Sequence, residues 1–211
     1  MARTAKTDFD RAETLDEIDR YSSLIDNAVI DFVTENDISD LRKETQNVFN
    51  ACLSYIYQHV FKPCKDDYIR YPIKNSKIDY DNIDLIYGIL YKYIYICDLY
   101  SKSVNVLSFS HLTGIDITVI YDWYNKTLRA DNPLYANIYK ILDRERERSL
   151  TDLLASGIKQ PVGLLAILNK EKGWALPGTT KEVHHVASVE SPEKVAERYR
   201  SRLADKGEND G

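Results

Sequence analysis

The stretch from residue 109 to residue 123, FSHLTGIDITVIYDW, constrains the fold of this chain more than any other segment. It predicts a short helix, a tight turn at Gly114 and a second helix, because glycine readily adopts the positive φ that such a turn requires. The apolar residues that would pack these two helices together are Phe109, Leu112, Ile115, Ile120 and Trp123. Ser110 is small where the helices approach, whereas Thr113 is polar at a position where an apolar residue is more common. The pattern favours a helix-turn-helix unit.

The positions between these apolar residues predict a surface for DNA, because the second helix of such a unit enters the major groove. The predicted DNA-binding residues are Ser108, Asp116, Ile117, Thr118, Tyr121, Asn125, Lys126 and Arg129. Those expected to contact base edges are Thr118, Tyr121, Asn125 and Lys126. Those expected to contact phosphates are Ser108 and Arg129. An ordinary helical hairpin inside an all-α core also uses a glycine turn, so the pattern leaves that alternative open.

Charge is unevenly distributed along the chain, whose formal net charge is -5. Residues 1–60 contain 6 Lys and Arg against 12 Asp and Glu, whereas residues 83–174 contain 11 against 10. DNA-binding proteins that act alone normally have a basic face, which a nearly neutral region does not supply. Between residues 143 and 150 the sequence DRERERSL alternates charges, and its arginines are expected to pair with neighbouring glutamates rather than with phosphate. Several copies acting together would be needed to neutralise a duplex.

Helical periodicity in the first third of the chain predicts an acidic N-terminal helical pair over residues 1–61. The first helix is expected to begin at Thr14, where Thr14 and Glu17 make a capping box, and the second to span residues 39–61. Residues 62–81 contain two prolines and many polar residues. This composition predicts a linker or extended loop, and therefore a domain boundary.

Residues 82–174 are predicted to form the helix-turn-helix DNA-binding and oligomerisation region. Its first helix is apolar nearly all round and rich in tyrosine, which is typical of a central helix or a subunit interface rather than of base stacking. An asparagine followed by Pro133 starts a long helix that stops at Gly157, and a short helix follows Pro161. Residues 175–211 are polar and predicted to be mostly disordered. The predicted fold is an all-α helical bundle containing a helix-turn-helix, followed by a long helix, a short helix and this tail.

The sequence contains none of the motifs GxSxG, HExxH and GxxxxGK[ST], so we expect no enzymatic activity and no cofactor. Cys52, His59 and Cys64 lie close in sequence, but their spacing fits no zinc pattern, and no metal is expected. The odd number of cysteines and the absence of an apolar N-terminal segment predict a reducing, intracellular location. No apolar run approaches the ~18 residues of a membrane span, so no membrane partner is expected.

Three motifs in order resemble those of terminase small subunits, the DNA-packaging proteins of tailed phages and prophages. LTGIDITVIYDWYNK, at residues 112–126, is similar to their helix-turn-helix with a tryptophan near the end of its second helix. NPLYANIYKILDRERERSLTDLLASG, at 132–157, is similar to the long helix that follows, with its charged centre. KQPVGLLAILNKEKGW, at 159–174, is similar to the short helix that closes on Gly-Trp. The likeness covers somewhat under half of the chain, and the first ~80 residues have no counterpart in it.

The resemblance implies a protein without catalytic activity that forms a ring in the bacterial host cytoplasm. It would recognise double-stranded viral DNA through its helix-turn-helix domains and deliver that DNA to the large, ATP-driven terminase subunit. Ring assembly would place many nearly neutral modules on one duplex, so that avidity replaces a basic patch. Asp116 and Asp122 depart from this picture because carboxylates repel phosphate, although a carboxylate can accept from cytosine N4. Asp116 can instead cap the second helix.

Two other functions are compatible with the same motifs. A phage or mobile-element regulator of transcription or replication would use the unit as a dimer, with half-sites ~34 Å apart. A helical protein-interaction module would use the hairpin without contacting DNA. The number of subunits in solution separates the first two readings, because a ring favours packaging and a dimer favours regulation.

Overall fold

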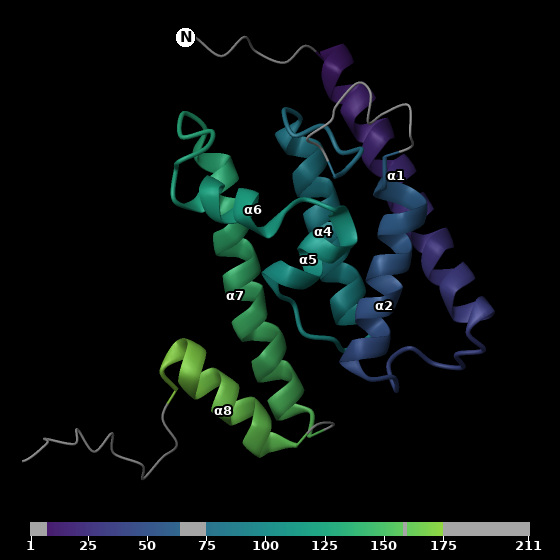
Figure 1. Ribbon diagram of the computed structural model, residues 1–211, viewed down its shortest axis with the longest axis vertical. Helices are drawn as coiled ribbons and strands as arrows, with labels where there is room; N and C mark the ends of the chain where they lie inside the picture. Colours follow the sequence, from purple (N-terminus) through teal and green to yellow (C-terminus); the bar gives the residue numbers. More distant parts are fainter. Residues whose placement is uncertain (1–7, 64–74, 158–159, 175–211) are drawn as a thin grey trace, which may run out of the picture. The chain divides into compact units, whose positions relative to one another are not determined.

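The computed structural model describes residues 8–63, 75–157 and 160–174 (Figure 1). All regular secondary structure in these ranges is helical, so the chain has the all-α fold that its periodicity predicts. The helices are α1 (Asp8–Glu35), α2 (Gln46–Ile56), the π-helical turn η1 (Tyr57–Phe61), α4 (Ile83–Leu99), α5 (Val106–Thr113), α6 (Ile117–Tyr124), α7 (Pro133–Ala155) and α8 (Pro161–Lys172). None of them has both the length and the apolar character that a membrane crossing would require. The tail predicted from residue 175 lies outside the described residues.

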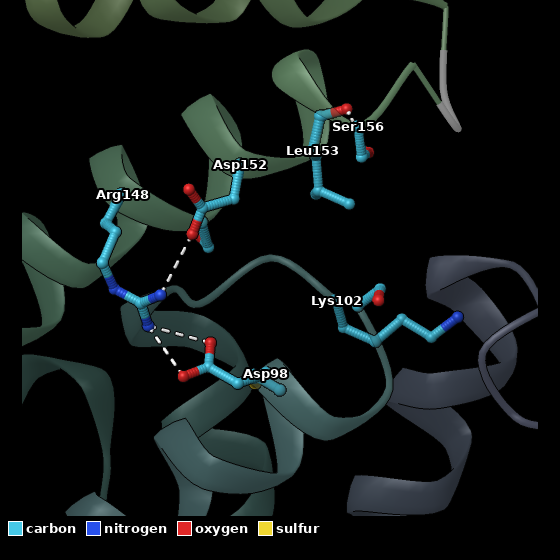
Figure 2. Close-up of a pocket in the computed structure, with 9 residues that line it drawn as sticks. Asp98, Lys102, Arg148, Asp152, Leu153 and Ser156 are labelled. Carbon is cyan, nitrogen blue, oxygen red and sulfur yellow. Dashed lines mark hydrogen bonds and ion pairs between the residues drawn. The ribbon is translucent and has the colours of Figure 1, made fainter.

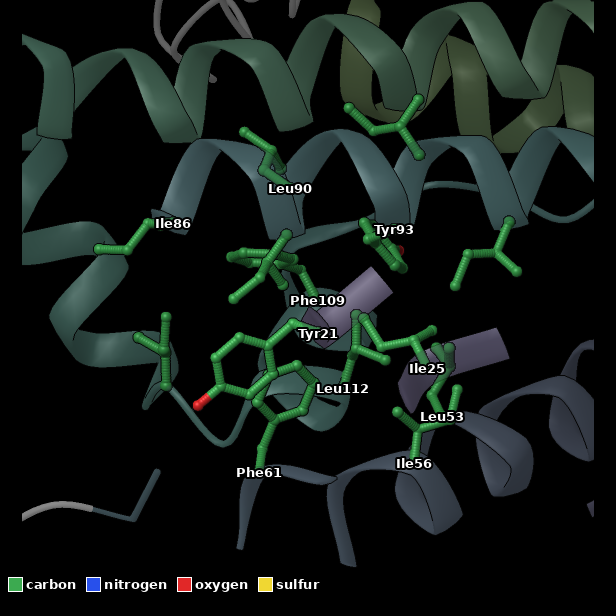
Figure 3. Packing of buried hydrophobic residues seen from close by; sticks show 14 of the residues in the cluster. Tyr21, Ile25, Leu53, Ile56, Phe61, Ile86, Leu90, Tyr93, Phe109 and Leu112 are labelled. Carbon is green, nitrogen blue, oxygen red and sulfur yellow. The ribbon is translucent and has the colours of Figure 1, made fainter. Parts of the chain in front are cut away.

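One hydrophobic core joins α1, α2, η1, α4, α5, α6 and the first half of α7. Figure 3 shows side chains from these helices meeting in its centre, including Tyr21 of α1, Phe61 of η1 and Phe109 of α5. The Tyr21 and Phe61 rings stack with their centroids 5.3 Å apart. A separate, smaller cluster packs Leu150 and Leu153 of α7 against two leucines of α8. Burial of this apolar surface is the main force that stabilises the fold.

The predicted boundary at residues 62–81 is wrong as a division between domains. The helices before and after it share the main core, since α1 packs along α4 and α2 packs against α5. Part of the segment is itself buried: Ile78 is in the core, and the Ser76 hydroxyl donates to the Thr113 carbonyl. Hydrophobic periodicity identifies which face of a helix is buried, but not which other helix covers that face. Residues 64–74 lie outside the described part of the chain.

Capping residues set where the helices begin. Asn82 accepts a hydrogen bond from the Leu85 N–H at the start of α4, and Asn132 accepts one from the Leu134 N–H ahead of α7. Both starts are as predicted. The two N-terminal starts are wrong: α1 begins at Asp8, so Thr14 lies inside it, and α2 begins after Thr45 rather than near residue 39.

Candidate nucleic-acid interface

The turn between α5 and α6 requires glycine for two reasons. Gly114 has φ 72°, in the left-handed region, and its N–H donates to the Ser110 carbonyl at 2.8 Å to end α5. A Cβ at this position would collide with the Tyr57 ring and would lie 2.6 Å from the Asn75 carbonyl oxygen. Any other side chain would therefore be strained both in its backbone and in its contacts. The turn predicted at this residue is present.

The apolar side chains predicted to join the two helices are all in the core. None is more than 1% exposed: Phe109, Leu112, Ile115, Ile120 and Trp123. Trp123 packs α6 against α7, because its ring centroid lies 5.1 Å from that of Tyr135. Tyr80 meets the same indole edge-on from the segment before α4, at 6.1 Å. The buried side of α6, formed by Ile120 and Trp123, thus fixes the position of the helix.

Polar side chains within α5 are used to build the turn. The Thr113 hydroxyl donates to the Phe109 carbonyl at 2.8 Å and accepts from the Ile115 N–H at 3.2 Å. The Ser110 hydroxyl donates to the Ile115 carbonyl at 2.6 Å. Buried polar groups need such partners, because an unsatisfied one costs about 1–3 kcal/mol. Thr113, which departs from the usual apolar pattern, is accommodated in this way.

The outer face of α6 is open to solvent. The predicted base-contacting residues, all exposed, are Thr118, Tyr121, Asn125 and Lys126. Ile117 is half-buried at the start of the helix. Asp116 caps α6, accepting from the Thr118 N–H at 2.8 Å and from the Thr118 hydroxyl at 2.7 Å. These two bonds lower the pKa of Asp116 below its ordinary value, so its charge serves the helix start.

A tyrosine of α7 supports this face, which sequence reasoning missed. The Tyr139 ring lies 5.5 Å from the Tyr121 centroid and 4.4 Å from the Tyr124 centroid. Tyr121 and Tyr124 both remain 41% exposed. Their spacing of three residues puts them on the same side of α6, but nothing local in the sequence indicates that Tyr139 lies against them. The contact restricts both rings while leaving each side chain partly exposed.

Ser108, predicted to contact phosphate, cannot do so. It is 2% exposed, and its hydroxyl donates to the Asn50 side-chain oxygen of α2 at 3.3 Å. Its backbone N–H is capped by the Asn105 side chain at 2.7 Å. α2 covers this side of α5, and that contact joins residues 58 positions apart, which no local pattern reveals.

Arg129, also predicted to contact phosphate, is held against the protein. Its guanidinium forms an ion pair with Asp81 at 2.5 Å and donates to the Tyr135 hydroxyl at 3.3 Å. It also lies over the Tyr135 ring, 4.9 Å from the centroid. The residue is structural: it ties the loop after α6 to the segment before α4.

The charges around α6 are not those of a basic surface. Asp122 is exposed and accepts a hydrogen bond from the Thr127 hydroxyl at 2.9 Å. Between residues 116 and 126 the face thus carries two exposed carboxylates, Asp116 and Asp122, and one ammonium, that of Lys126. Each copy of this face would attract phosphate only weakly. The candidate interface is therefore not a basic patch within the nearly neutral region of residues 83–174.

Two arginines of the charged centre of α7, Arg144 and Arg148, pair with carboxylates. Arg148 donates to both Asp98 oxygens at 2.8 Å and to Asp152 at 3.1 Å (Figure 2). Arg144 lies 3.5 Å from the Glu145 carboxylate. Arg148 borders a hollow of about 310 Å³ between the end of α4 and α7, and its guanidinium is already neutralised there.

Among the described residues, no group of three or more His, Cys, Asp or Glu side chains is placed to hold a metal ion. Cys52 lies in the core, where burial raises the pKa of its thiol to about 12, and Cys64 lies outside the described ranges. A second hollow, of about 290 Å³, adjoins the turn at Gly114.

Comparison with protein-family models, with curated proteins and with solved structures finds no match for this chain.

Proposed function

We propose that the protein is a non-catalytic DNA-binding adaptor that uses α6 as its recognition helix. The observation that carries this proposal is that α6 is held by buried residues on one side and exposes polar residues on the other. The turn at Gly114 and the buried Trp123 fix α6, while Thr118, Tyr121 and Asn125 project from it into solvent. A supported helix with an open polar face is what entry into a major groove requires.

The exposed side chains of α6 supply suitable chemistry for reading base edges. The Asn125 amide can bond an adenine edge in two places, a contact worth about 1–3 kcal/mol in discrimination. The Tyr121 phenol can donate to or accept from a base or a phosphate, whereas the Thr118 hydroxyl, which donates to Asp116, can accept from a base amino group. Lys126, just beyond the helix, supplies the positive charge for a neighbouring phosphate. Ser108 and Arg129 take no part.

Weak attraction per copy favours action as a homo-oligomer. Because residues 116–126 carry two carboxylates and one ammonium, a single α6 face gains little from phosphate neutralisation. Several copies bound to one duplex gain affinity through their high effective concentration. The resemblance to terminase small subunits supports a role for such an oligomer in viral genome packaging, where it would deliver DNA to the large terminase subunit. A dimeric regulator of transcription or replication would use α6 in the same way.

The test is binding of a fluorescent duplex DNA to the full chain, measured by anisotropy at low salt. Lys126→Glu should weaken binding at least tenfold in an oligomer, because every copy then repels phosphate. Lys43→Glu is the matched control, since it makes the same change at an exposed residue ahead of α2. Arg129 is left intact because its loss would disturb the fold. Equal affinities of the wild type and Lys126→Glu, or no binding at all, would leave only a protein-interaction role.

A further inference from the structure

Three tyrosines lie together at the surface where α6 meets α7. Tyr121 and Tyr124 are three residues apart on α6, and Tyr139 is on α7, which packs along α6 (Figure 1). The Tyr139 ring centroid lies 4.4 Å from that of Tyr124, with the ring planes 36° apart. It lies 5.5 Å from that of Tyr121, with the planes 47° apart. We call these three residues the tyrosine cluster.

The protein covers the cluster only in part. Tyr121 and Tyr124 are each 41% exposed, and Tyr139 is half-buried. Within the part of the chain that the structure describes, the hydroxyl groups of Tyr121 and Tyr124 bond no other protein group. Trp123, which is 1% exposed, already packs α6 against α7. The exposed area of the two rings on α6 is therefore available to a partner.

The position of Tyr121 determines which kind of partner covers the cluster. Tyr121 lies between Thr118, one turn earlier, and Asn125, one turn later, and all three side chains are exposed. A partner that covers the Tyr121 ring therefore also covers the polar face of α6. Resting on the proposed function, which places DNA on that face, we take DNA as the partner that lies on the cluster too.

Flat aromatic rings suit the faces of bases better than their edges. In a paired duplex the faces of each base are covered by its neighbours in the stack, and the major groove presents only base edges. The faces become accessible where the strands are unpaired, and proteins that bind single strands stack bases on aromatic side chains. Since Tyr124 already lies against Tyr139, a base on the exposed Tyr124 ring would extend this series of rings.

The charges close to the cluster in sequence make stacking the main source of affinity for a strand. Two ammonium groups follow its rings, those of Lys126 and Lys140. Two carboxylates, those of Asp122 and Asp143, balance them. A strand held by charge alone would therefore gain little. Stacking of one base on an aromatic ring contributes about tenfold in affinity without any net charge.

We propose that the tyrosine cluster binds an unpaired base of DNA, which stacks on the exposed ring of Tyr124 beside Tyr121. The protein then binds most tightly where a duplex adjoins a single-stranded segment. Thr118 and Asn125 contact the paired part, and the cluster holds a base of the unpaired part. The stacking tolerates any sequence, because every base has an aromatic face. A fully paired duplex is a weaker ligand, bound through the polar face alone.

The first measurement compares two DNAs that differ only in an unpaired segment, by fluorescence anisotropy with the full chain. One is a fully paired duplex, and the other is the same duplex with a short oligothymidine extension on one strand. The extension should tighten binding by the wild type about tenfold. Equal affinities for the two DNAs would overturn the stacking of a base while leaving the proposed function intact. No binding of either DNA would overturn both.

The second measurement assigns the preference to the cluster. Tyr124→Leu and Tyr139→Leu should each remove most of the preference for the extended DNA, while Tyr124→Phe, which keeps the ring, should retain it. Tyr91→Leu is the matched control, because Tyr91 is a 56% exposed tyrosine on α4, and it should change neither affinity. Circular dichroism checks that every variant keeps its helices. A preference that survives Tyr124→Leu would overturn the role of the cluster.

The third measurement locates the base directly. A 5-iododeoxyuridine in the extension cross-links under ultraviolet light to an aromatic side chain that stacks on it, and mass spectrometry of the digested protein identifies the residue. Cross-links to Tyr121 or Tyr124 are expected. Cross-links confined to other residues would overturn the inference. So would a subunit association that Tyr124→Leu abolishes without changing the preference, because the cluster would then contact protein rather than DNA.

Discussion

α5 and α6 are joined by a three-residue turn that begins at Gly114 and have eight residues each, yet their polar side chains are buried to very different extents. In α5 the hydroxyls of Ser108 and Thr113 are buried and bonded within the protein. In α6 the polar side chains of Thr118 and Asp122 face solvent. Within the unit, α5 thus supports the structure, and α6 exposes its polar side chains to solvent.

The difference follows from what surrounds each helix. α5 packs against α2, η1, α4, α6 and α7, so most of its side chains meet protein, with Leu107 and His111 as the exposed ones. α6 rests chiefly on α7 and on α5, which leaves its opposite side open. Substitutions in α5 or the turn should therefore change the free energy of unfolding, whereas outward substitutions in α6 should change binding instead. Four changes test this contrast, in decreasing order of expected effect.

Gly114→Val should have the largest effect, roughly 4–6 kcal/mol in the free energy of unfolding. A β-branched residue is strained at φ 72°, and its side chain would collide with Tyr57. Urea unfolding followed by circular dichroism measures the loss. Gly163→Ala in α8 is the control, because a Cβ there meets nothing within 4 Å, and it should be neutral or slightly stabilising. Similar behaviour of the two variants would mean that the turn tolerates side chains.

Trp123→Ala should cost about 3–5 kcal/mol, because it leaves a cavity where α6 meets α7. Tyr124→Ala, at the next residue, should cost clearly less, since that ring is 41% exposed. The same unfolding experiment compares them. If Tyr124→Ala were as destabilising as Trp123→Ala, then α6 would not have distinct inner and outer faces.

Thr113→Val should cost about 1–3 kcal/mol, because the buried Phe109 carbonyl and Ile115 N–H would both lose a partner. Thr118→Val makes the identical change on α6, where water can replace the lost hydroxyl at the exposed Asp116 carboxylate, and should cost less than about 1 kcal/mol. Thermal and urea unfolding both report the difference. Equal costs would contradict the contrast between the two helices.

The smallest effect concerns pH. Hydrogen bonds from Thr118 lower the pKa of Asp116 in the folded protein, so this carboxylate stabilises the fold above its unfolded pKa. That contribution is lost as the pH falls through the lowered folded pKa. Unfolding midpoints measured from pH 5 down to pH 2 should therefore fall slightly more for the wild type than for Asp116→Asn, which keeps a capping side chain. Identical slopes would show that the cap carries no charge-dependent stability.

The buried apolar residues of the candidate site could be predicted from sequence. The residues that form its exposed surface could be predicted only in part. Phe109, Leu112 and Trp123 follow local helical spacing, so their burial was predictable. Ser108 and Arg129 could not be placed, because what removes them from the surface lies far along the chain, in α2 and at Asp81. The shared core of the N-terminal pair was missed for the same reason: long-range packing leaves no mark in local periodicity.

The central claim is that α6, and not α5, is the face that meets DNA. The most direct measurement is the change in backbone amide NMR signals of the full chain when a short duplex is added at low salt. The account predicts the largest shifts at Thr118, Tyr121, Asn125 and Lys126, with small shifts at buried residues of α5 such as Ser108. Shifts confined to other helices, or none at duplex concentrations up to about 1 mM, would contradict it.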